Sequence, residues 1–374
     1  MGLSRRRFVQ LSSCVPLGFS GKVLAAPSSI DERGFVSIGG IDQWIAIQGG
    51  DTRNPGILFL HGGPGEAQSP FLSQFLPWQR DFTVVNWDQR GAGKTYGRNG
   101  ASTPDMTLDR MVNDICEVTQ NVCRRLSQKK LILVAQSFGS LLGVHAIKKR
   151  PELFHAYVGT AQIVSITESF LDLARYAREQ ARKTGDRATL EALDKADALK
   201  GIARLGGLRR ASSKWAMSAS DLPYTKLLDR FRGTPPYPKG DVADWVEGAR
   251  FSGNTIGMHA PVMDMRTLGL DMPIPFFIVQ GRDDHITGAE PARAYAEDIR
   301  APTKGVFPID GGHYACFTQS EGIRRRLAQP CPPTGRLTSG FHANRAEFVG
   351  KTPVTLLGEF QGLRRALHRT KRST

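Results

Sequence analysis

The most constraining feature of the sequence is a serine set among small residues, between a strand pattern and a helix pattern. Ala135-Gln-Ser137-Phe-Gly139 follows an apolar run at residues 131–134 and precedes a helical pattern that starts near Leu141. A serine on so sharp a turn is exposed above the sheet in a strained backbone conformation, and its neighbours two residues away must therefore be small. The segment predicts a strand, a tight turn and a helix, with Ser137 as a nucleophile.

Continuous apolar runs recur along the chain, and helical patterns separate them. Such runs are typical of strands that are buried on both faces. Strands are predicted at residues 57–60, 82–87, 131–134, 275–280 and 305–309, after an opening hairpin at residues 35–38 and 44–47. Helices are predicted at residues 111–122, 141–150 and 292–299. Strands that alternate with helices predict the α/β class, with a mainly parallel sheet and right-handed crossovers.

The alternation stops between residues 163 and 262. This segment is rich in Ala, Arg, Lys, Asp and Glu at helical spacing, and it has no pattern of a buried strand. In this architecture it predicts a helical cap over the carboxyl ends of the strands. The predicted organisation is a core in two parts (33–162 and 263–328), a cap (163–262) and a basic C-terminal extension of unknown structure (329–374).

A glycine-rich loop, His61-Gly-Gly63-Pro-Gly65, directly follows the strand predicted at residues 57–60. An acyl-transfer transition state develops negative charge on one oxygen, and backbone N–H groups in a loop without side chains approach that oxygen closely. We expect the N–H groups of Gly63 and Phe138 to form the oxyanion hole. His61 is interpreted as a structural residue of the loop.

The remaining catalytic residues are expected downstream of the cap, because the chain order in this architecture is nucleophile, acid, histidine. Two carboxylates, Asp283 and Asp284, follow a predicted strand, and Asp284 is preferred by its position. His313 follows the last predicted strand in a glycine-rich loop and is the expected general base, with His285 as the alternative. In a triad of this kind, the acid holds the imidazole in the tautomer that accepts the serine proton.

The N-terminus predicts export. Arg5, Arg6 and Arg7 precede a moderately apolar stretch and a small-residue site near Ala26, so residues 1–26 are typical of a twin-arginine signal peptide. The stretch is too short and too polar for a stable membrane span. We therefore expect a periplasmic or extracellular protein. A lipid anchor on Cys14 is the less favoured alternative.

The formal net charge of +15 is concentrated at the two ends of the chain. Residues 1–26 carry +4 and residues 320–374 carry +8, which leaves +3 for the rest. A basic face for nucleic acid on the folded body is therefore not expected. The five cysteines form no CxxC pair and no Cys/His cluster with metal spacing, so neither a metal nor another cofactor is expected.

Two glycine loops, the serine turn and the downstream carboxylate and histidine together carry a family resemblance. The motifs are His61-Gly-Gly-Pro-Gly65, Asp88-Gln-Arg-Gly-Ala-Gly93, the Ser137 turn, Gly281-x-x-Asp284 and Gly312-His313. They resemble the proline iminopeptidase family of α/β-hydrolases over about residues 33–320. The resemblance implies a mainly parallel eight-stranded sheet with a helical cap. It also implies cofactor-free release of an N-terminal residue, typically proline.

The sequence departs from that family pattern at the serine turn, where Ala135 replaces the usual glycine, and in its long C-terminal extension. By the resemblance, Arg90 forms an ion pair that supports the oxyanion loop. The resemblance also implies cap glutamates that hold the free amine of the substrate. Four cap glutamates are available for that role: Glu168, Glu179, Glu191 and Glu247.

The motifs favour a serine hydrolase that acts on a small molecule or a short peptide through an acyl-enzyme. A proline iminopeptidase-like aminopeptidase is the first hypothesis, and a carboxylesterase or lactonase on the same fold is the second. A haloalkane dehalogenase or an epoxide hydrolase is disfavoured, because those enzymes need a carboxylate where this chain has Ser137. An inactive binding protein that has kept the fold is the remaining alternative. The sequence indicates no particular oligomeric state.

Overall fold

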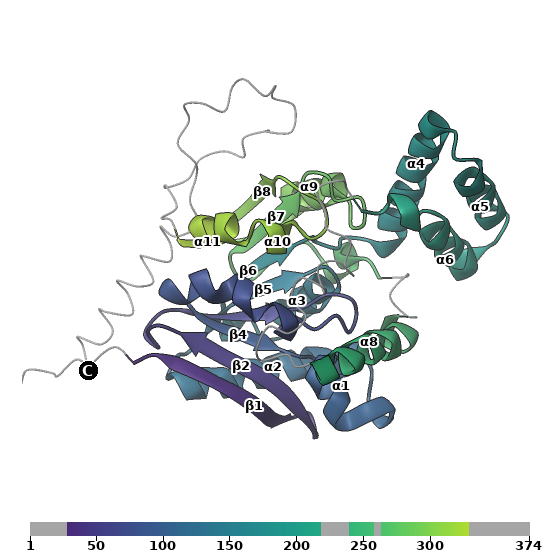
Figure 1. Ribbon diagram of the computed structural model, residues 1–374. Coiled ribbons are helices and arrows are strands. Elements are labelled where there is room, and N and C mark those ends of the chain that lie inside the picture. Colours follow the sequence, from purple (N-terminus) through teal and green to yellow (C-terminus); the bar gives the residue numbers. More distant parts are fainter. Residues whose placement is uncertain (1–27, 218–238, 258–262, 329–374) are drawn as a thin grey trace, which may run out of the picture.

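The computed structural model describes residues 28–217, 239–257 and 263–328 (Figure 1). Eight strands form one sheet at its centre. They are β1 (Ile30–Ile38), β2 (Ile41–Gly49), β3 (Gly56–Leu60), β4 (Thr83–Trp87), β5 (Leu131–Gln136), β6 (Phe154–Thr160), β7 (Phe276–Gly281) and β8 (Lys304–Ile309). The sequence patterns do not predict β6, because His155 and Gly159 interrupt its apolar run. The other seven strands lie where the patterns predict them.

The strands pair in the order β1-β2-β4-β3-β5-β6-β7-β8. β1 and β2 form an antiparallel hairpin, β2 is antiparallel to β4, and all later pairs are parallel. The predicted mainly parallel eight-stranded sheet is confirmed. Leu60 at the end of β3 pairs with Ala135 near the end of β5. The loop that starts at His61 and the turn at Ser137 therefore leave the sheet side by side.

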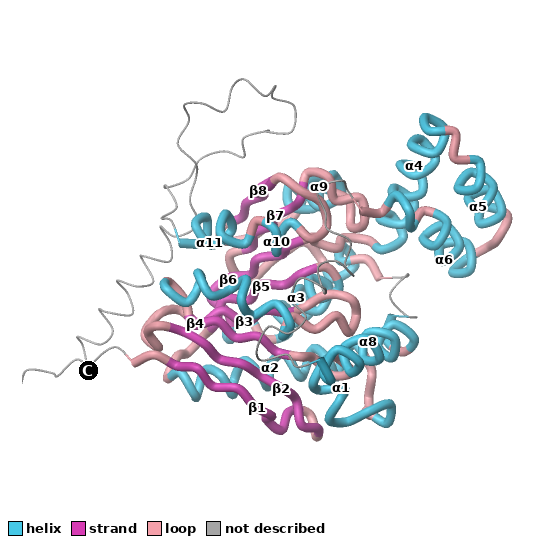
Figure 2. Tube along the Cα trace, in the orientation of Figure 1, coloured by secondary structure: helices cyan, strands magenta, loops and turns pink. Residues whose placement is uncertain are grey.

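Helices cover both faces of the sheet (Figure 2). Along the central strands, the side chains alternate between two cores, one on each face. Leu58 and Leu60 of β3 belong to one core, whereas Ile57 and Phe59 belong to the other. Burial of each such side chain contributes about 1.5–3 kcal/mol. The first core includes α2 (Leu108–Leu126), α3 (Phe138–Lys149) and α9 (Ala289–Asp298). The second includes η1 (Ser69–Arg80), α10 (Ala315–Thr318) and α11 (Ser320–Ala328).

The local sequence determines where helix α2 begins and ends and which of its faces is buried. Its N-cap, Thr107, accepts a hydrogen bond from the backbone N–H of Arg110, and the helix ends where Ser127 adopts the left-handed conformation. Its apolar positions recur at helical spacing and face the sheet, as the sequence predicts. Cys116 and Cys123 lie on this buried face as free thiols.

The cap lies between β6 and β7 in the sequence. It contains α4 (Ile166–Thr184), α5 (Arg187–Asp197), α6 (Gly201–Ala211), η4 (Ser213–Trp215) and α8 (Lys239–Asn254). Helices α4, α5 and α6 project away from the sheet in Figure 1. They pack on one another around a small cluster of Ala174, Ala177, Leu193, Ala196 and Leu208. The predicted helical cap is thus present in the described part of residues 163–262.

Helix α8 lies on the core beside α1 (Gly93–Asn99) instead of projecting outward (Figure 1). The indole N–H of Trp245 donates to the carbonyl oxygen of Ala67 at 2.9 Å, and the Ser252 hydroxyl donates to that of Gly91 at 2.9 Å. These bonds place α8 over the loops that follow β3 and β4. Short 3-10 helices complete the fold: η2 (Gly100–Ser102), η3 (Pro151–Leu153) and η6 (Met265–Leu268).

Several sequence predictions concern residues outside the described part of the chain. They are the signal peptide at residues 1–26, the lipid site at Cys14 and the extension at residues 329–374. Within the described ranges, no helix combines the length and the apolar character that crossing a bilayer requires.

Candidate active site

Ser137 connects β5 to α3 with φ of 51° and ψ of −122°. A positive φ at a residue with a side chain costs about 1–3 kcal/mol and persists only where the surroundings impose it. The Ser137 N–H donates to the carbonyl oxygen of Thr160 at 3.0 Å. The Ser137 carbonyl oxygen accepts from the N–H (2.8 Å) and the hydroxyl (2.6 Å) of Ser140. These bonds hold the strained turn that the sequence predicts.

Both small positions around Ser137 have a structural reason. A Cβ at Gly139 would lie 2.6 Å from the carbonyl oxygens of Leu60 and His61, so no side chain fits there. The methyl group of Ala135 is fully buried. It is accommodated because the facing residue is Gly143, where a Cβ would come within 3.1 Å of it. Alanine at position 135 is therefore compatible with the turn.

His313 lies in the loop after β8, with 5% of its surface exposed. Its Nε2 is 3.0 Å from Oγ of Ser137, and its Nδ1 is 3.2 Å from each carboxylate oxygen of Asp284. Because a carboxylate only accepts hydrogen bonds, we assign the imidazole proton to Nδ1. Nε2 is then the acceptor for the Ser137 hydroxyl. The structure brings together the three residues that the sequence singles out.

Asp284 is buried after β7 and accepts hydrogen bonds on both oxygens. Oδ1 accepts from the N–H groups of Ile286 (2.9 Å) and Thr287 (3.1 Å). Oδ2 accepts from the Thr287 hydroxyl (2.7 Å) and the Gln280 amide (2.9 Å). Burial raises the pKa of the Asp284 carboxyl, but the His313 charge and the hydrogen bonds from His313 and Thr287 outweigh it, so the pKa lies below its ordinary value. The carboxylate is therefore ionised at neutral pH.

The loops that carry the acid and the histidine are bonded to each other. The N–H of Arg282 donates to the carbonyl oxygen of Ile309 at 2.9 Å. A Cβ at Gly281 would lie 2.2 Å from the carbonyl oxygen of Gly312, so only glycine allows this approach. Asp283, the alternative acid, is exposed, and its side chain is not among the partners of His313 in the described structure.

The predicted oxyanion loop lies against Ser137. A Cβ on Gly62 would come within 2.9 Å of the Cβ of Ser137, and Gly63 follows with φ of 110°. On the other side of Ser137, Phe138 is the first residue of α3. The first N–H groups of a helix have no acceptor within the helix. The two predicted donors, Gly63 and Phe138, thus flank the serine.

The oxyanion loop is held in place by Gln89. The Gln89 N–H donates to Nε2 of His61 at 3.1 Å, and its side-chain amide donates to the His61 carbonyl oxygen at 3.0 Å. Burial lowers the pKa of His61 to about 4, which fits a neutral, structural imidazole. The structural ion pair expected of Arg90 is present, but the expected support of the oxyanion loop was wrong. Its ion pair, at 2.8 Å to the buried Asp114, joins the Asp88 loop to α2 instead of supporting the oxyanion loop.

Glu66 directly follows the oxyanion loop, and its side chain is partly buried. Burial raises the pKa of its carboxyl to about 7, although the charges of His313 and Arg209 act in the opposite direction. Arg209 comes from cap helix α6 and also interacts electrostatically with Tyr314. The Glu66 carboxyl therefore interacts electrostatically with both His313 and Arg209. No sequence motif identifies Arg209, and the one sequence signal for Glu66 is its position next to the glycine loop.

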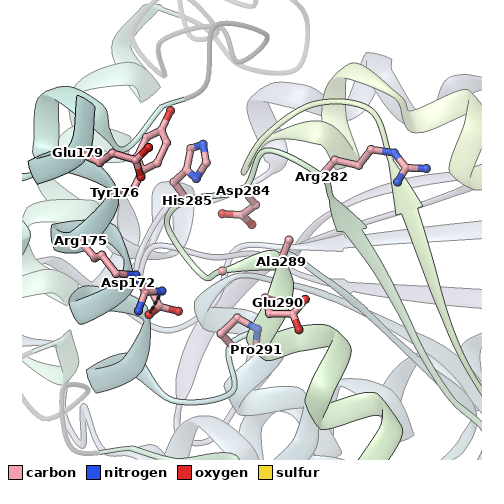
Figure 3. A pocket seen from close by; sticks show the side chains of 11 residues that line it. Asp172, Arg175, Tyr176, Glu179, Arg282, Asp284, His285, Ala289, Glu290 and Pro291 are labelled. Atoms are coloured by element: carbon pink, nitrogen blue, oxygen red, sulfur yellow. Dashed lines mark hydrogen bonds and ion pairs between the residues drawn. The ribbon is translucent and has the colours of Figure 1, made fainter. Parts of the chain in front are cut away.

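A cavity of about 280 Å³ lies between α4 and the loop that carries Asp284 (Figure 3). The side chains of Tyr176 and His285 stack at its rim, with ring centroids 3.7 Å apart. His285, the alternative base, is thus placed against the cap, and His313 takes the position beside Ser137. Of the α4 residues that line the cavity, Asp172 and Arg175 form an ion pair at 2.8 Å.

The four cap glutamates proposed from the sequence are exposed or half-exposed. Glu168 pairs with Arg266 (2.6 Å), Glu179 with Lys183 (2.6 Å) and Glu247 with Arg250 (2.8 Å), and Glu191 is exposed. Glu179 reaches the rim of the cavity in Figure 3, and the other three do not line it. In the described ranges, no group of three or more His, Cys, Asp or Glu side chains is arranged to hold a metal ion.

Comparison with known proteins agrees with the fold described above. A sequence model of the family described as alpha/beta hydrolase fold matches residues 55–320. The probable aminopeptidase YbaC of Bacillus subtilis is 28% identical over 294 residues, which cover 74% of this chain and 88% of that protein. A proline iminopeptidase of Neisseria meningitidis is 32% identical over 119 residues, which cover 32% of this chain and 36% of that protein. These relatives confirm the resemblance found in the glycine loops.

A solved structure shows the same fold. The proline iminopeptidase of Mycobacterium smegmatis superposes with a TM-score of 0.58 at 18% identity, over 80% of this chain and 97% of that chain. At this level of identity, the superposition supports the fold alone.

Proposed function

Because the chain belongs to the α/β-hydrolase family and is a hydrolase enzyme, we propose that it is a serine hydrolase. Ser137 is the nucleophile, His313 the general base and Asp284 the orienting acid of this proposal. This proposal rests on one observation about the geometry of the three residues. The His313 ring lies 3.0 Å from the Ser137 hydroxyl and 3.2 Å from Asp284, while Ser137 has a strained, positive φ.

Acylation begins with attack of Ser137 Oγ on an ester or amide carbonyl carbon. Nε2 of His313 accepts the hydroxyl proton, and the ionised Asp284 stabilises the imidazolium that forms. The carbonyl oxygen becomes an oxyanion, which accepts hydrogen bonds from the N–H groups of Gly63 and Phe138. Each such donor contributes about 10²–10³-fold to the rate. His313 then donates its proton to the leaving amine or alcohol, and the acyl group stays on Ser137.

Deacylation repeats these steps with water as the nucleophile. His313 takes a proton from the water molecule, which attacks the acyl carbon and forms a second oxyanion in the same place. Collapse of that intermediate breaks the bond to Ser137 Oγ, and His313 returns the proton to the serine. The product is a free carboxylic acid, and the cycle requires no cofactor.

We further propose that the substrate is a short peptide with a free N-terminal amine, typically a proline amine. The names of the relatives support this choice, since one is a probable aminopeptidase and another a proline iminopeptidase. In such a substrate, the amine is only two bonds from the scissile carbonyl carbon. A carboxylate that binds the amine must therefore lie close to the oxyanion loop. Glu66 meets that condition, because it follows this loop and interacts with the charge of His313.

A substrate panel tests this choice. Proline anilide should be hydrolysed, whereas N-acetylproline anilide, which lacks the ammonium charge, should react much more slowly. A short acyl ester without an amine serves as the comparison. If the acetylated anilide reacts as fast as proline anilide, the amine is not recognised and the aminopeptidase proposal fails; if the ester reacts and neither anilide does, the enzyme is a carboxylesterase. If the folded protein hydrolyses none of the three, an inactive binding protein is favoured.

The proposal includes export by the twin-arginine route, supported by the Arg5-Arg6-Arg7 pattern and the apolar stretch that follows. Substitution of both Arg5 and Arg6 by lysine keeps the charge and should stop export of the folded enzyme. Cell fractionation with an activity assay measures the effect, and unchanged export would exclude the route. Fractionation of a Cys14→Ser variant tests the lipid anchor, because loss of membrane association would favour it.

A further inference from the structure

Thr287 holds both oxygens of Asp284. Its hydroxyl donates to Oδ2 at 2.7 Å, and its N–H donates to Oδ1 at 3.1 Å. With 2% of its surface exposed, Thr287 is as well protected from water as the acid itself. Hydrogen bonds from one residue to both oxygens fix the plane of the carboxylate. That plane sets the direction in which Nδ1 of His313 is held.

The cap reaches Thr287 through Ser169, in the first turn of α4. The Ser169 hydroxyl lies within hydrogen-bond distance of two carbonyl oxygens, that of Thr287 at 3.0 Å and that of Ser165 at 2.9 Å, and can donate to either. Ser169 is buried, with 3% exposure, so water does not replace this contact. Helix α4 is thereby joined to the peptide unit of the residue that orients the acid.

A second contact links the same helix to the other side of the acid. Tyr176 lies seven residues after Ser169, about two helical turns on the same face. Its ring stacks on that of His285, the residue after Asp284, at an interplanar angle of 15° (Figure 3). Helix α4 thus contacts the acid loop both at position 285 and at position 287. Asp284 itself lines the cavity between α4 and the acid loop.

We propose that Thr287 is a positioning residue for Asp284, and that cap helix α4 keeps Thr287 in place through Ser169. The inference rests on the serine-hydrolase function proposed above and adds a residue to it. The cap then has two roles, because α4 lines the cavity beside Asp284 and also sets the orientation of the acid. Gln280, which donates to Oδ2 from the sheet side, supplies the complementary support from the core.

The central variant is Thr287→Val, which keeps the shape of the side chain and removes the hydroxyl donor. Loss of a hydrogen bond that positions a charged catalytic group should slow the reaction by about 10- to 100-fold. We expect kcat for a small ester to fall by about that factor, with KM unchanged. Loss of a bond that favours the ionised carboxylate also raises the apparent pKa of the Asp284–His313 pair. The acidic limb of the pH–rate profile should therefore move to higher pH.

Three further variants separate positioning from general stability. Thr287→Ser restores the hydroxyl and should recover most of the rate. Ser169→Ala removes the cap contact and should give a smaller decrease in kcat. Thr184→Ala is its matched control, because Thr184 makes a similar hydroxyl-to-carbonyl bond at the exposed end of the same helix. That control should leave kcat unchanged.

The rate of Ser137 labelling by a small fluorophosphonate, per folded molecule, is measured beside kcat, KM and the thermal midpoint. Slow labelling in Thr287→Val with recovery in Thr287→Ser supports the inference. Wild-type rates in Thr287→Val, or equally slow rates in both Thr287 variants, overturn it while the proposed function stands. Should Thr287→Val fail to fold, Ser169→Ala against Thr184→Ala decides in the same way. If the folded wild-type protein does not react with the fluorophosphonate, both the proposed function and this inference are wrong.

Discussion

The sheet and the outer cap helices of this hydrolase are stabilised in different ways. Two extended apolar cores hold the sheet between its helices, with many side chains fully removed from water. Helices α4, α5 and α6 share one small cluster that is mostly alanine. On their surface, Arg178 pairs with Asp194 and Asp197, and exposed pairs of this kind contribute little to stability.

The proposed chemistry follows the same division. Ser137, Asp284 and His313 all come from loops at the carboxyl edge of the sheet, where the rigid core positions them. The outer cap contributes Arg209, which interacts electrostatically with Glu66, and Ser169 next to the acid loop. Changes in the core loops should therefore abolish the reaction, whereas changes in the cap should tune its rate and its choice of substrate.

The largest expected effect comes from the acid. Asp284→Asn keeps the shape of the side chain but removes the charge that holds the His313 tautomer, so kcat should fall about 10⁴-fold. Asp283→Asn is the matched control one residue earlier, on an exposed side chain, and should keep wild-type activity. Steady-state kinetics on purified, folded variants measures both. Equal losses in the two variants would contradict the assignment of Asp284.

A smaller effect is expected from a core residue that has no part in the chemistry. Arg90→Met removes the fully buried partner of Asp114 and leaves the ion pair with Arg110, so the free energy of unfolding should fall by about 3 kcal/mol, the low end for a broken buried pair. Urea unfolding measures this loss. Activity per folded molecule should stay at the wild-type level, which separates stability from catalysis. Arg300→Met, at the exposed pair with Asp271, should change the stability little.

In the cap, Leu193→Ala removes the largest fully buried contribution of α5 to its cluster. A substitution of this kind costs about 2–4 kcal/mol, and here the loss should be confined to α4, α5 and α6. Hydrogen exchange should become faster in those helices and stay unchanged in the sheet. Labelling of Ser137 by a small fluorophosphonate should persist. Faster exchange in the sheet as well would show that cap and core unfold as one unit.

The smallest expected effect concerns Glu66. Because the pKa of its carboxyl is about 7, the group is mostly neutral below that pH and ionised above it. If it holds the substrate amine, KM for proline anilide should fall as the pH rises through 7. Glu66→Gln should raise KM about 10-fold above pH 7 and remove this dependence. An ester without an amine is the control, and its KM should be the same in both proteins.

The sequence predicts the parts of this fold that local rules determine. Strands buried on both faces must be continuously apolar, so β3, β5 and β7 are visible in the sequence, whereas β6 is concealed by His155 and Gly159. The chain order and the glycine loops suffice to select Ser137, Asp284 and His313 for the positions in which the structure brings them together.

The remaining contacts depend on packing that local sequence does not encode. β4 lies between β2 and β3, so the loop after β4 contacts both the oxyanion loop and α2. Arg90 in this loop forms its ion pair with Asp114 of α2. The electrostatic interaction of Glu66 with Arg209 joins a core loop to cap helix α6, between residues that are far apart in the sequence. The bond from Ser169 to Thr287 joins residues 118 positions apart, and no pattern around either residue predicts it.

The central claim is that Ser137 is a nucleophile activated by His313. The direct measurement is reaction of the folded protein with a fluorophosphonate, followed by mass spectrometry of its peptides. We predict one adduct, on the peptide that contains Ser137, absent in Ser137→Ala and formed much more slowly in His313→Ala. Equal labelling of Ser137→Ala, or an adduct on another residue of the folded wild type, would contradict the account.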